Sequence, residues 1–211
     1  MEPDKTEDAN RILPSMLPMK EDLSKVTLKL VGGAEEEFVQ KVKTVRPQDK
    51  EATIGTCIHN IFAVYNPEAT KDEMVEMATR TVKNFSLEKH IPEPNALIES
   101  ISSLYDYLTK TYGPAVKTGR EIPFRQIING QTCVGSIDFV WYTSDKECVL
   151  VDYKNLSCAT VGVVDPESEE YIGHYIPQQK AYKDALERSG LKVRACLLHL
   201  SLQERVVEIG F

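Results

Sequence analysis

The sequence predicts an α/β fold, in which a mixed central β-sheet is flanked by helices, with an α-helical N-terminal part. Apolar residues recur at helical spacing from about residue 53 to residue 112, and from Lys117 onward the spacing changes to that of strands. One more helical pattern and two further strand patterns complete the chain. Elements in this order favour a single sandwich around a mixed sheet.

The composition is that of one globular domain. Of the 211 residues, 42% are hydrophobic and 27% are charged, and no apolar run approaches the roughly 20 residues that span a membrane. The first residues lack the regions of a signal peptide, so we expect a cytoplasmic protein without membrane contact. We expect residues 51–211 to form one domain. Residues 1–50 are expected to be an N-terminal extension or lead-in segment, flexible over residues 1–24, with one short strand at residues 26–30.

Three helices are expected in the first half of the chain. The first begins near residue 53 and ends at Pro67, and the second covers about residues 71–87. The third begins at Asn95, a residue suited to the N-cap position, and stops at Gly113-Pro114. Their apolar stripes are most simply core.

Most of the sheet is expected in the second half. Pro123 indicates an edge strand, because proline cannot donate to a central ladder. Pro177 suits the first turn of a helix. The expected elements are an edge strand over residues 121–124, a hairpin of residues 132–142 and 148–154, a helix over residues 177–189, and strands over residues 192–200 and 205–209.

Cysteine usage and charge bear on the class of protein. The five cysteines include no C-x-x-C pair, which argues against a disulfide framework, a zinc knuckle or an iron–sulfur cluster and favours buried thiols. A net charge of −7 has the wrong sign for a nucleic-acid binder. However, six basic and three acidic residues lie between His174 and Arg205. A metal-dependent nuclease also needs carboxylates, so net charge does not exclude one.

Two aspartates inside apolar strands carry the strongest chemical signal. Asp138 follows a Gly-Ser-Ile segment, and Asp152 lies in an apolar run that continues as Tyr153-Lys154. Such carboxylates are costly unless a cation compensates them. If the strands pair, both can meet at one end of the sheet, where Mg²⁺ finds the oxygen ligands that it prefers. Lys154 shares a face with Asp152 and can orient a water or stabilise charge on a phosphate, and the Tyr153 carbonyl can still reach the metal.

Each signal also has a simpler explanation. The aspartates and the lysine can be ordinary strand-end charges, since D-x-K is a common pattern. His59 on the first helix can be structural, and Glu121 can be a solvated strand residue. Gln178 and Tyr182, one helical turn apart, can be a partly exposed polar pair.

Together the segments form an ordered series. They are Gly55-Thr56-x-x-His59, Glu121-x-Pro123-Phe124, Gly135-x-x-Asp138, Asp152-Tyr153-Lys154 and Gln178-x-x-x-Tyr182. This series resembles the RecB-type nuclease domain of the PD-(D/E)XK superfamily. It is most similar to the C-terminal nuclease domain of bacterial helicase–nucleases of the RecB/AddA kind, the UvrD-like helicase C-terminal exonucleases. The resemblance covers about residues 50–211.

The resemblance implies a restriction-endonuclease-like fold and a metal centre. It implies that His59, Asp138 and Asp152 bind the metal with help from the Tyr153 carbonyl. The same comparison makes Asp138 and Asp152 catalytic residues and makes Lys154 the catalytic lysine. The implied cofactor is Mg²⁺, with Mn²⁺ as a substitute, and no iron–sulfur cluster is expected because the cysteine spacing of the cluster-bearing relatives is missing.

The remaining matches concern support of the site and binding of DNA. Glu121 matches the acidic residue on the strand before the first aspartate and is counted as catalytic. Gln178 and Tyr182 match the motif that supports the site and contacts DNA. One departure is Asn155, because relatives commonly have threonine or serine after the lysine; asparagine keeps the ability to form hydrogen bonds.

The expected function is metal-dependent hydrolysis of DNA phosphodiester bonds by an exonuclease involved in double-strand-break repair and recombination. The expected partners are DNA, as single-stranded ends, and a helicase motor in the same or a partner chain, since the sequence has no Walker A motif. A catalytically silent module of the same fold that holds DNA or a protein stays an alternative. A metallohydrolase of another phosphoester is a third.

Overall fold

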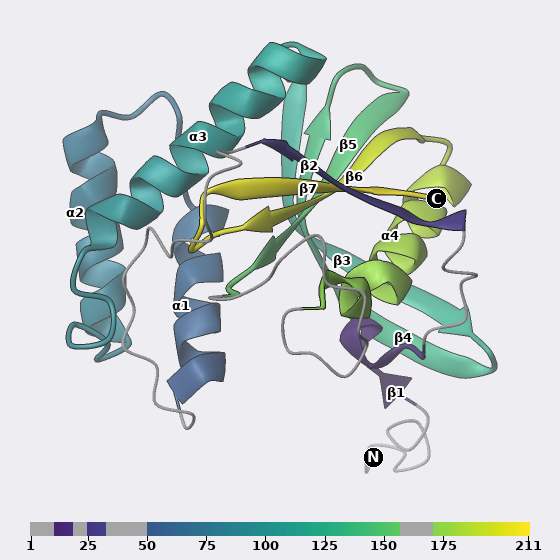
Figure 1. Ribbon diagram of the computed structural model, residues 1–211, viewed down its shortest axis with the longest axis horizontal. Helices are drawn as coiled ribbons and strands as arrows, with labels where there is room; N and C mark the ends of the chain where they lie inside the picture. The colour runs from purple at the N-terminus through teal and green to yellow at the C-terminus, as the bar shows by residue number, and fades with distance from the viewer. Residues whose placement is uncertain (1–10, 19–24, 33–49, 157–170) are drawn as a thin grey trace, which may run out of the picture.

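The computed structural model describes residues 11–18, 25–32, 50–156 and 171–211, which form a mixed seven-stranded sheet with helices on both faces (Figure 1). The strands are ordered β1-β4-β5-β6-β7-β2, and β3 pairs along the length of β4. The prediction of a mixed α/β fold is confirmed. The elements are β1 (Arg11–Ile12), β2 (Thr27–Gly32), α1 (Glu51–Ala63), α2 (Lys71–Asn84), α3 (Pro94–Tyr112), β3 (Lys117–Ile128), β4 (Gln131–Tyr142), β5 (Glu147–Lys154), α4 (Ile176–Arg188), β6 (Lys192–Leu200) and β7 (Arg205–Gly210), with short 3-10 turns at Pro14–Met16 and Ile172–Tyr175.

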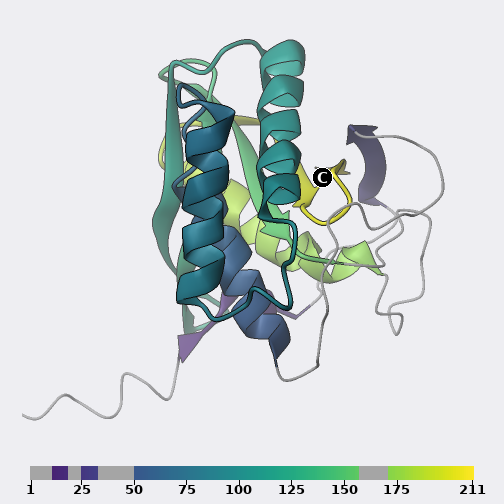
Figure 2. The same cartoon turned by 90° about the vertical axis from the view of Figure 1, so that its left-hand side faces the viewer.

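The sheet separates two hydrophobic cores. Helices α1, α2 and α3 cover one face, as Figure 2 shows, and α4 covers the other. Side chains of β5 alternate between the two cores: Val149, Val151 and Tyr153 pack towards α1–α3, whereas Cys148 and Leu150 pack towards α4. Since β5 and β6 are parallel neighbours, α4 provides the crossover between them.

Helix boundaries follow local capping chemistry. At the start of α2 the Thr70 hydroxyl accepts from the Glu73 backbone N–H while the Glu73 side chain accepts from the Thr70 N–H, a capping box. The prediction that Asn95 caps the third helix is wrong. Glu93 is the N-cap residue and Pro94 occupies the first turn, where its missing N–H costs nothing. The first helix also ends earlier than expected, at Ala63.

The β3–β4 hairpin is longer than the sequence predicted. Strand β3 covers 12 residues where an edge strand of four was expected, and it does lie at an edge of the sheet, paired with β4. The turn is formed by Asn129 and Gly130, whose φ angles are +52° and +76°. Asparagine followed by glycine suits the two-residue turn in which both residues have positive φ, so the turn fixes the register of the whole hairpin.

Part of the expected lead-in segment belongs to the sheet. Residues 11–12 pair in parallel with β4, and β2 pairs antiparallel with β7. A Cβ atom on Gly135 would lie 2.9 Å from Pro14 Cδ, so glycine lets the segment pack closely against β4. The prediction of a flexible lead-in is therefore wrong for residues 11–17, because buried Pro14 and this strand pairing fix them.

The cysteines at positions 57, 133, 148 and 196 are free and buried, as expected; Cys158 lies outside the described residues. Within the described ranges, no helix combines the length and the apolar character needed to cross a membrane.

A buried histidine on β6 generates a prediction about stability. Ser100 Oγ donates to the Ser201 carbonyl at 2.7 Å and lies 3.2 Å from His199 Nε2. Since the hydroxyl proton is used on Ser201, Nε2 must carry a proton and donate to Oγ. Burial lowers the pKa of His199 to about 3.

We expect His199 to make the folded state sensitive to acid. Its pKa is depressed on folding, so its contribution to stability is complete above pH 6.5 and is lost as the pH falls towards 3. The free energy of unfolding should therefore gain a slope of about 1.4 kcal/mol per pH unit between pH 6 and 5. In urea unfolding, the slope of wild type should exceed that of His199→Gln by this amount. His174→Gln, which changes an exposed histidine, serves as control, and equal slopes in wild type and His199→Gln would contradict the assignment.

Candidate active site

Strands β4 and β5 stop pairing where the two predicted aspartates lie. Their ladder ends at the pair Phe139–Val151, and Asp138 and Asp152 are the next residues. Asp138 Oδ2 accepts a hydrogen bond of 2.8 Å from the Tyr153 backbone N–H. The Asp138 carboxylate thus satisfies a β5 backbone N–H that has lost its partner on β4. Polar side chains therefore occupy the end of the ladder, between the two hydrophobic cores.

The alternation of side chains along β3 is interrupted at the same end of the site. Arg120 points to the α1–α3 side, where its guanidinium donates to the Tyr105 hydroxyl at 2.9 Å, whereas Ile122 packs in the core under α4. Residues two apart normally share a face. The exception arises at Glu121, which has a φ of +47°, a conformation that costs about 1–3 kcal/mol for a residue other than glycine.

Strand β4 shows the matching change. Ile137 packs under α4 and Phe139 packs under α1–α3. Asp138 lies between the pairs Arg120–Phe139 and Ile122–Ile137, as Glu121 does on the other strand, so it is also turned out of the regular alternation. One ligand atom each of His59, Glu121 and Asp138 lies within 4.8 Å of the others. His59, on α1, reaches the pair with Nδ1 3.6 Å from Asp138 Oδ1. This group can hold a metal ion.

A chain of hydrogen bonds links this group to the predicted lysine. Ser136 Oγ donates to Glu121 at 2.6 Å, and the Ser136 carbonyl accepts from the Tyr182 hydroxyl at 2.7 Å. The Tyr182 oxygen accepts from Gln178 Nε2 at 3.1 Å, which leaves Gln178 Oε1 to accept from Lys154 Nζ at 3.1 Å. Gln178 and Tyr182 are buried, so they are not the partly exposed polar pair that their sequence also allowed.

Lys154 is a largely buried cation that lies beside Asp152. Its ammonium is 2.6 Å from Asp152 Oδ2 and 4.6 Å from the centre of the Tyr175 ring. Burial alone would lower the pKa of Lys154, but the charges of Asp152 and Asp138 outweigh it and raise the pKa above its ordinary value. The lysine is therefore a fixed positive charge, unsuited to the role of a base.

The pKa values of the two aspartates shift in opposite directions. Burial, with the charge of Asp138, raises the pKa of Asp152 to about 7, although Lys154 opposes the shift. Burial also acts upward on Asp138, but the His59 hydrogen bond and the positive charges of His59 and Lys154 hold its pKa below the ordinary value. Burial acts downward on His59, yet Asp138 raises the pKa of the imidazole overall.

The residues present suit a hard divalent cation. Asp138, Glu121 and His59 supply two carboxylates and an imidazole. Asp152 is outside this three-residue group, and its oxygen Oδ1 is buried without a hydrogen-bond partner in the described part of the chain. An orphaned carboxylate oxygen is costly in a buried position, and a cation beside it would remove that cost.

All the residues predicted for the site come together here, and three further residues join them. Ser136 was not assigned a role, although it lies next to the predicted aspartate strand. Tyr175 had no sequence signal, because its ring reaches Lys154 only through the turn before α4. Asn155 donates to the Gly55 carbonyl at 3.4 Å and so connects β5 to α1.

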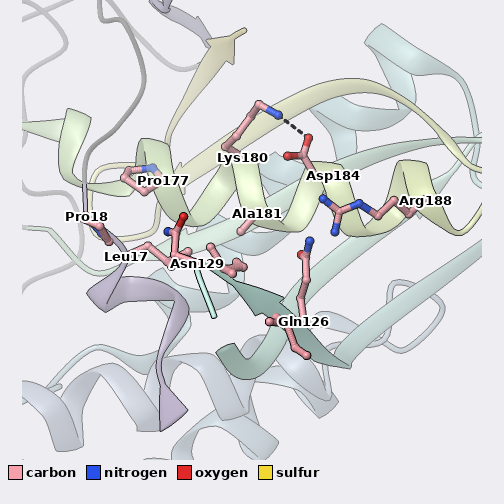
Figure 3. A pocket seen from close by; sticks show the side chains of 11 residues that line it. Leu17, Pro18, Gln126, Asn129, Pro177, Lys180, Ala181, Asp184 and Arg188 are labelled. Atoms are coloured by element: carbon pink, nitrogen blue, oxygen red, sulfur yellow. Dashed lines mark hydrogen bonds and ion pairs between the residues drawn. The ribbon is translucent and has the colours of Figure 1, made fainter. Parts of the chain in front are cut away.

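A separate cavity of about 290 Å³ lies between α4 and the end of the β3–β4 hairpin (Figure 3). Gln126 and Arg188 face each other across it, and Lys180 forms an ion pair with Asp184 at its rim. None of the predicted site residues lines this cavity, so it is distinct from the candidate active site.

No protein-family model matches the sequence, and no curated protein matches it either.

We expect the metal-free protein to be stabilised by Mn²⁺ or Mg²⁺. Binding to the folded state alone adds about 2.7 kcal/mol to the free energy of unfolding at 100 times Kd. Asp138→Asn keeps an acceptor for Tyr153 N–H but removes a charged ligand, so the increase in Tm should be lost. Glu147→Gln, a surface carboxylate paired with Lys192 at 2.9 Å, should behave as wild type. The same Tm increase in Asp138→Asn would place the cation elsewhere.

Proposed function

We propose that this chain is a Mg²⁺-dependent DNA nuclease with a restriction-endonuclease-like fold, similar to the RecB-type nuclease domains. One observation carries the proposal. Five segments between Gly55 and Tyr182 converge on one site, where a histidine and two carboxylates lie within 4.8 Å of one another and a largely buried lysine lies 2.6 Å from a third carboxylate. This combination of groups suits hydrolysis of a phosphodiester, in which water cleaves a P–O bond.

The proposed metal ligands are His59, Asp138 and Asp152, with Glu121 beside His59 and Asp138, and the resemblance implies the Tyr153 carbonyl as a further ligand. A bound divalent cation supplies Lewis-acid polarisation of the phosphate and a water of lowered pKa. The attacking water oxygen forms the new P–O bond, the ester oxygen leaves, and the proton of the water passes to solvent or to the leaving oxygen.

The chain itself contributes a fixed positive charge. Lys154 is held by Asp152 and by Gln178, whose amide is in turn held by the Tyr182 hydroxyl. Because the raised pKa keeps the lysine protonated, its role is to stabilise the negative charge that develops on the phosphate. Gln178 and Tyr182 orient it, so its geometry is set before substrate arrives.

We further propose that the chain acts with a helicase motor, in the same or a partner polypeptide, on single-stranded DNA ends during repair of double-strand breaks. The resemblance to RecB/AddA nuclease domains supports this. The net charge of −7 is consistent with a domain that receives DNA from a partner, which supplies much of the grip on the phosphate backbone.

Cleavage of end-labelled DNA tests the activity. We expect wild type to cleave in Mg²⁺ or Mn²⁺ and not in EDTA, and Lys154→Met to be slower by about 10²–10³-fold, the usual loss when one charge-stabilising donor is removed. Lys192→Met, which alters an exposed lysine paired with Glu147, is the matched control. Cleavage by Lys154→Met at the wild-type rate would refute the role of the lysine, and absence of both cleavage and metal binding in wild type would favour a silent binding module.

Calcium should occupy the site without supporting turnover. Ca²⁺ tolerates looser coordination than Mg²⁺ and holds ligands in less defined geometry. We therefore expect Ca²⁺ to raise Tm and to inhibit cleavage in Mg²⁺ by competition. Rapid cleavage in Ca²⁺ alone would count against the proposed centre.

A further inference from the structure

The β3–β4 hairpin has one covered and one open face beyond Glu121. Phe124 points to α4 and stacks edge-on against Tyr182, with ring centres 5.1 Å apart. The alternate residues Pro123, Arg125 and Ile127 point the other way and are exposed, Ile127 to 74%. Among the large hydrophobic side chains of the described residues, Ile127 is the most exposed, so it offers apolar surface to a ligand that lies on this face.

The adjoining strand completes this open face. Residues directly opposite one another in an antiparallel pair share a face, and the register pairs Pro123 with Ser136, Arg125 with Val134 and Ile127 with Thr132. These six residues are called the hairpin platform. On the far side of β4, Arg11 of β1 pairs with Thr132 and borders the platform.

The platform leads directly into the candidate active site. Ser136, at its inner end, donates to Glu121, and Asp138 follows two residues later on β4. From Thr132 at the outer end to Asp138 is a strand distance of about 20 Å at roughly 3.3 Å per residue. A chain lying along the platform would thus end at the candidate metal ligands.

The charge of the platform differs from that of the chain as a whole. The protein has 32 acidic residues and a net charge of −7, yet residues 123–137 contain one arginine and no acidic residue. Arg125 forms no ion pair with any carboxylate of the described residues, so its charge is available to a phosphate. This face suits an anionic polymer.

The recessed site favours a single strand. The side chains of His59 and Asp138 are only 28% and 10% exposed, so a phosphodiester has to approach partly buried groups, which an unpaired, flexible strand does more readily than a duplex. We propose that the hairpin platform is the track on which single-stranded DNA approaches the site, with Arg125 on a phosphate and Ile127 against a base or sugar. This inference rests on the proposed nuclease function and adds the surface that holds its substrate.

Binding of a fluorescently labelled single-stranded oligonucleotide to the full chain in EDTA tests the platform. We expect Arg125→Ala to raise Kd about three- to tenfold and to reduce the slope of log K against log salt by about 1, as loss of one phosphate contact does. Ile127→Ser should raise Kd without changing the salt slope. Arg188→Ala is the matched control, because Arg188 contacts Gln126 in the cavity under α4 (Figure 3). Ile127 also lines that cavity, whereas Arg125 does not, so Arg125→Ala is the variant specific to the platform.

The outcomes separate the platform from the nuclease proposal. Wild-type affinity and salt slope in both Arg125→Ala and Ile127→Ser would overturn the platform, and weaker binding by Arg188→Ala alone would place the strand in the cavity under α4. Cleavage in Mg²⁺, measured in parallel, then decides the function. Cleavage with no effect of the platform variants supports the nuclease and overturns the platform, whereas Arg125-dependent binding with neither cleavage nor metal binding supports the platform and overturns the nuclease.

Discussion

Lys154 and Asp152 form an ion pair that is almost completely removed from solvent, and its burial constrains every element around it. Taking two charges out of water costs several kcal/mol per ion, which is offset only when the geometry is good and the remaining donors are satisfied. Here the ammonium also meets the Gln178 amide oxygen and the Tyr175 ring. Helix α4 must therefore lie at a fixed distance from β5, and the bond from Tyr182 to the Ser136 carbonyl ties the same helix to β4.

The interrupted side-chain alternation in β3 and β4 allows residues from both faces of the sheet to meet at one site. Two regular strands would send the side chains of alternate residues to separate cores, with His59 on one side of the sheet and Lys154 on the other. Because Glu121 adopts a positive φ and the alternation also breaks at Asp138, the two carboxylates lie close to each other and to His59. The strain is local, and the hydrogen bond from Ser136 to Glu121 helps to hold it.

The parts of the site that follow from short-range periodicity were predictable. Asp152 and Lys154 share a face because strands have a period of two, and Gln178 and Tyr182 share a face because helices return after four residues. These pairs needed only the pattern of residues along the sequence, whereas the end of the β4–β5 ladder just before Asp138 is known from the structure alone.

Other features depend on contacts that a local pattern does not contain. The positive φ of Glu121 is stabilised by its surroundings and has no signature such as glycine. The pairing of residues 11–12 with β4 depends on the absence of a side chain at Gly135, far away in sequence. The cap of α3 went to Glu93 because Pro94 already fits the first turn, which outweighs the preference of Asn95 for the cap position.

His199 is buried and His59 is half-buried, and their neighbours favour opposite charge states of the imidazole. At His199 the hydroxyl of Ser100 accepts the imidazole proton, and burial keeps the ring neutral. At His59 the opposite holds, since Asp138 favours the protonated ring.

The candidate active site is short of positive charge. Three carboxylates, Glu121, Asp138 and Asp152, meet one lysine and one histidine. Burial, and then the charge of Asp138, raises the pKa of Asp152 to about 7, and Asp138 raises the pKa of His59 against the effect of burial. A bound divalent cation would replace protons on these groups and give Asp152 Oδ1 the partner that it lacks among the described residues. The two hydrophobic cores hold the strands in place, so the fold itself keeps the three carboxylates close together. A bound cation would then balance their negative charge.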